Sequence, residues 1–224
     1  FSTFAYGAAP AAVQMMTLNT AEHFKLERDL GSIAPGRRAD FLIVSDLAAL
    51  TIDEVYARGV HLASKGKLVA DIAPHDYPAR AKNTVNMLRD LAATDFDIAA
   101  PAGKNSVRAR VIGVVENQAP TKALEKELPV IDGLVGMDSE GDVCQIALVE
   151  RHRATGQVTN AFVSGFGYAR PCAMASTVAH DSHHMIVVGT NKADMAQAAN
   201  RLREVGGGVV LISEGRELAL VEMP

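Results

Sequence analysis

The sequence is poor in residues that mark several protein classes. Its 224 residues include only two cysteines, Cys144 and Cys172, and no tryptophan. Because the two cysteines do not form a Cys-x-x-Cys pair, neither a structural zinc motif nor a redox motif is supported. One disulfide between them is an open alternative, but so few cysteines favour reduced, partly buried thiols. We therefore expect a cytoplasmic protein.

Positive charge and long apolar runs are also scarce. The net charge is -4, the pI is near 6.0, and the longest cationic cluster is Arg151-His152-Arg153. Nucleic-acid binding needs a concentrated positive surface, so we expect no nucleic-acid partner. No apolar run reaches the roughly 18–20 residues that cross a bilayer, so we expect no membrane partner. Residues 1–6 lack the charged start of a signal peptide.

The remaining composition is that of a globular protein, with 48% hydrophobic and 21% charged residues. The apolar spacing over residues 9–24 predicts two short helices ending near Phe24, with Pro10 in the first turn and Asn19-Thr20 capping the second helix. Residues 39–44 and 55–63 favour strands, and Lys65-Gly66-Lys67 indicates a turn before a further strand.

The segment 73–105 is broken by prolines and predicts a connector with one helical turn near residues 88–93. Beyond it, apolar runs predict strands at 107–115, 144–150, 157–163, 172–179 and 185–189. Asn191 caps a predicted helix through Val205, three glycines at 206–208 end it, and a hairpin around Glu214-Gly215-Arg216 follows. This pattern predicts an α+β domain with a mainly antiparallel sheet over residues 106–224.

One dense group of polar side chains interrupts the apolar strands. Three of the seven histidines fall within residues 180–184, in the order His180, Asp181, Ser182, His183 and His184. Histidine acts as acid, base or metal ligand near neutral pH, and an aspartate can orient an imidazole. The spacing matches no zinc helix and no catalytic triad. A functional loop and a hydrogen-bonded polar turn are therefore equally good interpretations of these residues alone.

Other candidate motifs have simpler explanations. Gly165-Phe166-Gly167 is typical of a turn, and residues 116–118 of a solvated strand end. The glycines at 206–208 follow a helix and precede a strand, the reverse of a phosphate-binding loop, so we assign them to capping. Ser176 and Cys172 have no neighbouring base that the sequence can place, which argues against a nucleophile.

Two stretches resemble amidohydrolases. Residues 30–44 (LGSIAPGRRADFLIV) are similar to the segment that leads from the barrel of these enzymes to a small β-sandwich. Residues 15–22 (MMTLNTAE) are similar to the helix after the last barrel strand and the start of the next helix. The resemblance implies that residues 1–72 contain the last barrel helix and part of the β-sandwich. The catalytic (β/α)8 barrel is expected to be absent from this chain.

Further segments resemble the carboxyl-terminal domain of bacterial adenine deaminases. They are residues 112–118 (IGVVENQ), 149–152 (VERH), 164–167 (SGFG), 177–184 (TVAHDSHH) and 198–202 (AANRL). The resemblance implies conversion of adenine and water to hypoxanthine and ammonia, with a divalent metal (manganese, iron or zinc) in the intact enzyme. It also implies a purine substrate and a homo-oligomer.

The chain departs from that family in one respect. The metal ligands of the family lie in the barrel and include a His-x-His pair, which this sequence lacks. We therefore expect the carboxyl-terminal part of a larger metal-dependent hydrolase, inactive alone, with residues 180–184 facing the active site. A non-catalytic interaction module is one alternative, and an amidohydrolase with another substrate, such as a dihydroorotase or amidase, is a second.

Overall fold

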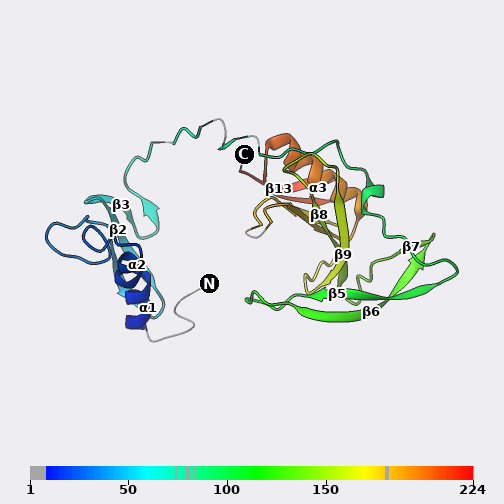
Figure 1. Cartoon of the computed structure of the whole chain (residues 1–224), viewed down its shortest axis with the longest axis horizontal. Helices are drawn as coiled ribbons and strands as arrows, with labels where there is room; N and C mark the ends of the chain where they lie inside the picture. Colours follow the sequence, from blue (N-terminus) through cyan, green and yellow to red (C-terminus); the bar gives the residue numbers. More distant parts are fainter. Residues whose placement is uncertain (1–8, 74, 79–80, 83, 180–181, 224) are drawn as a thin grey trace. The chain divides into compact units, whose positions relative to one another are not determined.

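The computed structural model describes residues 9–73, 75–78, 81–82, 84–179 and 182–223. The chain divides into two compact units, residues 1–76 and residues 77–224 (Figure 1). The boundary lies inside the expected connector 73–105. The later part of that connector packs within unit 2, because Met87, Leu91 and Phe96 are buried in its core.

Unit 1 combines two short helices with an antiparallel sheet. The helices are α1 (Ala9–Met16) and α2 (Leu18–His23), as predicted. Four strands follow in spatial order: β1 (Phe41–Asp46), β2 (Thr51–Ala57), β3 (Val60–Ser64) and β4 (Lys67–Leu68). The predicted turn at Lys65-Gly66 joins β3 to β4.

Two details of unit 1 correct the prediction. Asn19 and Thr20 lie inside α2 and do not cap it, because the helix begins at Leu18 and Thr20 donates to the carbonyl of Met15. The single strand expected over residues 55–63 is two strands. Arg58 and Gly59 both have positive φ, 51° and 77°, and turn the chain between β2 and β3.

Unit 2 is built on one nine-stranded sheet. Its spatial order is β13-β12-β10-β11-β8-β9-β5-β6-β7. β5 and β9 are parallel, and the other pairings described are antiparallel. The strands are β5 (Ser106–Gly113), β6 (Lys122–Ile131), β7 (Leu134–Val135), β8 (Val143–Val149), β9 (Val158–Ser164), β10 (Ala173–Ser176), β11 (Met185–Gly189), β12 (Gly208–Ser213) and β13 (Arg216–Glu222). The mainly antiparallel α+β prediction is confirmed.

The core of unit 2 lies between this sheet and helix α3 (Lys192–Val205). Met195 and Leu202 of the helix are fully buried, as are Val187 and Val210 of the sheet. A 3-10 helix, η3 (Ala93–Phe96), adds Phe96 to the same core. Both cysteines are free thiols and are buried, as expected.

The two ends of α3 show why the helix begins and ends where the sequence predicts. The Asn191 side chain accepts hydrogen bonds from the backbone N–H groups of Ala193 and Asp194. Gly206 ends the helix in the left-handed conformation, with φ 87°. The next two glycines do not cap it, which corrects the assignment of all three. A Cβ at Gly208 would lie 2.0 Å from the Val221 carbonyl oxygen, so this glycine permits β12 and β13 to approach.

Neither sheet of the described residues closes into a barrel. No helix among those residues is long and apolar enough to cross a membrane. The expected absence of the catalytic barrel therefore agrees with the fold of the part that is described.

We predict that Asn191→Ala lowers the free energy of unfolding of unit 2 by about 1 kcal/mol, because two N–H groups at the start of α3 lose their acceptor. Chemical denaturation monitored by circular dichroism measures this change. Asn191→Ser keeps a capping oxygen and should retain most of the stability. Equal losses in both variants would contradict the role of the cap.

Candidate functional site

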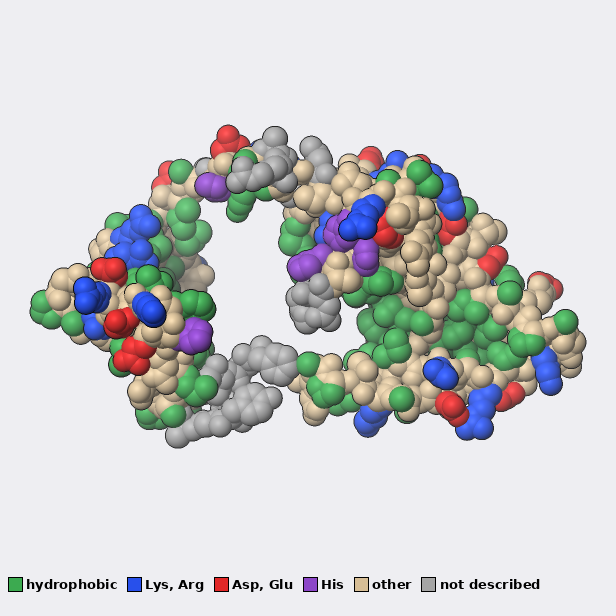
Figure 2. Space-filling view, in the orientation of Figure 1, with side chains coloured by type: hydrophobic (Ala, Val, Ile, Leu, Met, Phe, Trp, Pro, Cys, Tyr) green, Lys and Arg blue, Asp and Glu red, His purple; other side chains and the backbone are tan. Residues whose placement is uncertain are grey.

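The register of two strands brings separate polar segments together. β8 and β11 are antiparallel, with Val149 opposite Met185. Arg151 and His152, which follow β8, therefore lie beside His183 and His184, which precede β11. Histidine side chains gather at one place on unit 2 (Figure 2). We call Arg151, His152, Ser182, His183 and His184 the histidine corner.

Arg151 is the buried member of the histidine corner, with 8% of its surface exposed. Its Nε donates to the carbonyl of His183 at 2.7 Å, and its Nη2 donates to the carbonyl of Thr177 at 3.4 Å. Its Nη1 donates to the carbonyl of Thr84 at 3.2 Å and to its hydroxyl at 3.0 Å. One guanidinium thus connects three segments of the chain. Burial lowers the pKa of Arg151 from its ordinary value.

The three described residues of the predicted loop adopt a tight turn. His183 is exposed and has a φ of 54°, and its N–H donates to the carbonyl of Ala179 at 3.0 Å. The hydroxyl of Ser182 accepts from the N–H of His184 at 3.3 Å. His180 and Asp181, the other two predicted residues, lie outside the described residues.

His152 joins the loop from the opposite strand. Its Nε2 donates to the carbonyl of Ser182 at 3.2 Å, and its ring centroid lies 4.9 Å from that of His184. Nδ1 of His184 is buried and has no hydrogen-bond partner among the described residues. The rings of His152 and His184 therefore lie against each other, and His183, which is exposed like His152, comes directly before His184 in the turn.

Glu150 organises the turn that carries His152. Its carboxylate accepts from the N–H groups of His152, Arg153 and Thr155 at 2.6, 2.8 and 2.9 Å. It also accepts from the Thr155 hydroxyl at 3.0 Å. These hydrogen bonds, that from the Thr155 backbone first, lower the pKa of Glu150 to about 2. The carboxylate therefore stays charged at neutral pH and shapes this turn.

The histidine corner was only partly predictable. The histidine-rich segment stands out in the sequence, whereas Arg151 and His152 appear there only as part of a short cationic cluster and of the family-like segment 149–152. Their role depends on the pairing of β8 with β11, which a single sequence does not show. Thr177 lies in the family-like segment 177–184, but nothing in the sequence indicates that it or Thr84 accepts a hydrogen bond from Arg151.

The other candidates from the sequence have structural roles. The N–H groups of Gly165 and Gly167 donate to the carboxylate of Asp142 at 2.8 and 2.9 Å, which closes a turn. Residues 116–118 form an exposed turn. Burial raises the pKa of the Cys172 thiol, and burial raises that of Cys144 to about 12, so neither is an activated nucleophile.

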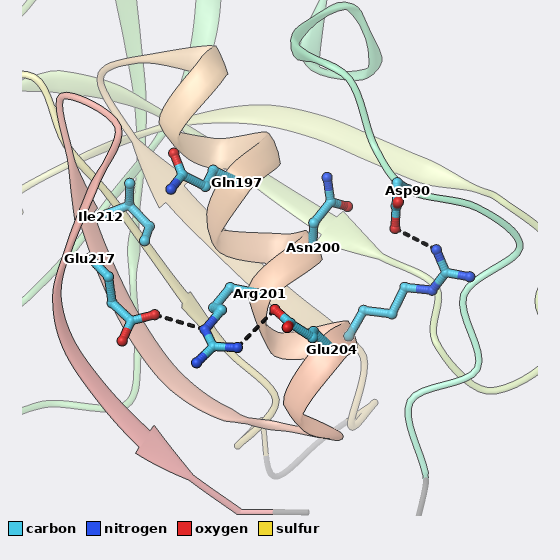
Figure 3. A pocket seen from close by; sticks show the side chains of 8 residues that line it. Asp90, Gln197, Asn200, Arg201, Glu204, Ile212 and Glu217 are labelled. Carbon is cyan, nitrogen blue, oxygen red and sulfur yellow. Dashed lines mark hydrogen bonds and ion pairs between the residues drawn. The ribbon is translucent and has the colours of Figure 1, made fainter.

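A hollow of about 530 Å³ lies along α3, and none of the described loop residues 182–184 lines it (Figure 3). Its charged side chains are paired: Arg201 with Glu204 and Glu217, each at 2.7 Å, and Arg203 with Asp90. Asn200 accepts from the N–H of Leu91 and donates to its carbonyl. These contacts hold the segment before η3 against the helix, so we assign the hollow a structural role.

A second hollow of about 680 Å³ lies in unit 1, between the two helices and β1. Its lining is mainly apolar, and Phe24 and Ile33 are 65% and 85% exposed. Such a surface can pack against another apolar surface, but few of its side chains are polar or charged groups that could catalyse a reaction.

The described residues contain no group of three or more His, Cys, Asp or Glu side chains that could hold a metal ion. The metal that the family resemblance implies therefore has no ligand set in this part of the chain. We assign no metal ligand among these residues.

Comparison with known proteins decides the family. Residues 118–224 match the sequence profile of the adenine deaminase C-terminal domain, and residues 4–92 match that of the amidohydrolase family. Over 213 residues the chain is 73% identical to an adenine deaminase of Mesorhizobium japonicum and 74% identical to adenine deaminase 3 of Rhizobium meliloti. The chain belongs to the adenine deaminase family. The resemblance of the sequence motifs is thereby confirmed.

The adenine deaminase relatives are much longer than this chain. The alignments cover 95% of the chain but only 35% of the Mesorhizobium protein and 36% of the Rhizobium protein. An adenine deaminase of Moorella thermoacetica, 45% identical, shows the same proportions. The histidine corner lies entirely within the part that matches the adenine deaminase C-terminal domain.

We predict that low pH lowers the free energy of unfolding of unit 2, because Glu150 becomes protonated. Its folded pKa of about 2 lies below the ordinary 4.5, so its stabilising effect is complete above pH 4.5 and is lost as the pH falls towards 2. Urea unfolding of the wild type and of Glu150→Gln between pH 7 and pH 2 measures this effect. The difference in stability between the two proteins should shrink across that window. A difference that stays constant with pH would contradict it.

Proposed function

We propose that this chain is the carboxyl-terminal part of a metal-dependent adenine deaminase and that residues 180–184 face its active site. The observation that carries the proposal is the 73–74% identity to proteins named adenine deaminase over 95% of the chain. The gathering of His152, His183 and His184 beside Arg151 supports the second half of the proposal, because it adds titratable side chains at a solvent-facing turn.

The proposed reaction is the hydrolytic deamination of adenine. Water adds to C6 of the purine, a C–O bond forms, the C6–N bond breaks, and ammonia leaves with hypoxanthine as the second product. Protons must move from the attacking water to the departing amino group. Side chains that hold a proton near neutral pH promote such transfers, and imidazole is the group best suited by its ordinary pKa.

Within this chain we propose different roles for the members of the loop. The side chain of His183 is exposed, so it is placed to contact a purine or a water molecule. His184 is partly buried against His152, and Ser182 accepts from its N–H, so these residues support the turn. His180 and Asp181 are proposed to contact substrate or water on the basis of sequence alone.

The intact enzyme is proposed to bind a divalent metal (manganese, iron or zinc) through residues other than those described. A bound divalent metal lowers the pKa of a coordinated water and polarises the group under attack. A homo-oligomer, a cytoplasmic location and the absence of nucleic-acid and membrane partners complete the proposal.

We expect the chain alone to be inactive and the full-length protein to convert adenine to hypoxanthine when loaded with a divalent metal. The loss of adenine absorbance together with ammonia release measures turnover in both proteins at equal concentration. Deamination by the chain alone would contradict the assignment of the metal site to other residues. A metal-loaded full-length protein that binds adenine without converting it would favour the non-catalytic alternative.

In the full-length enzyme, His183→Ala and His180→Ala should each lower kcat by about tenfold or more with little change in melting temperature, because each removes a group that moves or orients a proton. His23→Ala provides a histidine control: His23 is an exposed residue of α2 whose ring contacts Phe24. Unchanged kinetics in both loop variants would leave the loop with a structural role only.

A further inference from the structure

We propose that Arg151 is the positioning residue for the loop that carries His183 and His184. The inference rests on the proposed function, because it gives the buried arginine a purpose in catalysis beyond its contribution to stability. It assigns no substrate contact to Arg151 itself.

The contacts of Arg151 reach both ends of the loop. Its Nε donates to the carbonyl of His183, near the end of the turn, and its Nη2 donates to the carbonyl of Thr177, at the beginning. Thr177 is itself fixed to β12, the neighbouring strand in the sheet. Its hydroxyl accepts from the N–H of Gly208 at 2.8 Å, and its N–H donates to the carbonyl of Gly208 at 2.9 Å. The guanidinium therefore holds Thr177 and His183, one residue near each end of the loop, against the sheet.

The arginine is held in place on its other side. Nη1 donates to Thr84, and the backbone carbonyl of Arg151 accepts from the N–H of Asn86 at 2.7 Å. Residues 84–86, in the segment before η3, thus hold Arg151 in place through these hydrogen bonds. Because the side chain is 8% exposed and bonded at all three nitrogens, it has little freedom to move.

The backbone conformation of His183 explains why the hydrogen bonds from Arg151 are needed. A φ of 54° is uncommon for a residue with a side chain, and it persists only where surrounding contacts hold it. The hydrogen bond from Arg151 to the carbonyl of His183 and that from the His183 N–H to Ala179 hold the residue on both sides. Together these bonds fix the backbone from which the side chain of His183 extends.

The geometry favours arginine over lysine at this position. Three nitrogens of one planar group reach the carbonyl oxygens of Thr84 and of both ends of the loop, whereas an ammonium ion donates from a single point. A lysine could satisfy one of these oxygens while leaving the others without a donor. The loop that carries His183 and His184 would then lose its hydrogen bond to residue 151 at one of its two ends.

The test compares Arg151→Met and Arg151→Lys in the full-length, metal-loaded enzyme. We expect kcat to fall by about tenfold to hundredfold in Arg151→Met, since small displacements of positioned groups have effects of this size. The kcat of Arg151→Lys should lie between that of Arg151→Met and that of the wild type. In both variants, hydrogen exchange at the amides of His183 and His184 should accelerate by about tenfold or more, while Val187 in β11 keeps its protection.

Asp194→Ala provides the matched control. Asp194 is also buried and also holds a backbone segment through two hydrogen bonds, but its partners are the N–H groups of Glu214 and Gly215, in the turn between β12 and β13, and not the loop. It should lower the melting temperature and leave kcat within about twofold of the wild type, so that stability loss and mispositioning are separated.

Three results would overturn the inference: kcat of Arg151→Met within twofold of the wild type, an equal loss of kcat in Asp194→Ala, or unchanged exchange at His183 and His184. A wild-type enzyme without adenine deamination would instead overturn the proposed function. In that case the hydrogen-exchange measurement still tests whether Arg151 holds the loop, because it needs no turnover. Should Arg151→Met fail to fold, Arg151→Lys carries the same comparison.

Discussion

A guanidinium taken out of water must find acceptors for its N–H groups, and this requirement shapes the candidate site. Arg151 meets it with three carbonyl oxygens: those of Thr177 and His183, near the two ends of the loop, and that of Thr84, which is far from them in the sequence. Each of those residues is thereby fixed relative to the end of β8. The turn that exposes His183 depends on this arrangement, as does the approach of His152 to His184.

The sheet of unit 2 provides the frame on which this arrangement rests. The pairing of Val149 with Met185 brings the ends of β8 and β11 together, and both residues are buried in the core between the sheet and α3. A rigid core next to an irregular polar turn is a common way to present functional side chains. The chain spans 35–36% of the length of its adenine deaminase relatives. In the proposed function, therefore, the histidine corner contributes to a site that other parts of the enzyme complete.

Local signals in the sequence predicted much of this fold. Residues 185–189 form a strand because they are an uninterrupted apolar run, and α3 begins after Asn191 and ends at Gly206 because those residues satisfy its termini. β6 was not predicted, since Lys122, Glu125 and Lys126 give it a polar appearance. Its stability comes from pairing with β5 and from burial of Leu128, both of which depend on distant residues.

The candidate site was harder to predict for the same reason. The cluster at residues 180–184 is visible in one sequence, but the contacts of Arg151 arise from strand register and from a segment nearly 70 residues upstream. No local pattern encodes them. The comparison with adenine deaminases assigns the family, and the hydrogen bonds of the structure show how its histidine loop is held.

The most direct measurement is a crystal structure of the full-length enzyme with a bound purine. The account predicts that the imidazole of His183 lies within hydrogen-bonding reach of the purine or of a water molecule bound to it, with Arg151 still donating to the carbonyl of His183. A histidine loop that faces bulk solvent, away from the bound purine, would contradict it.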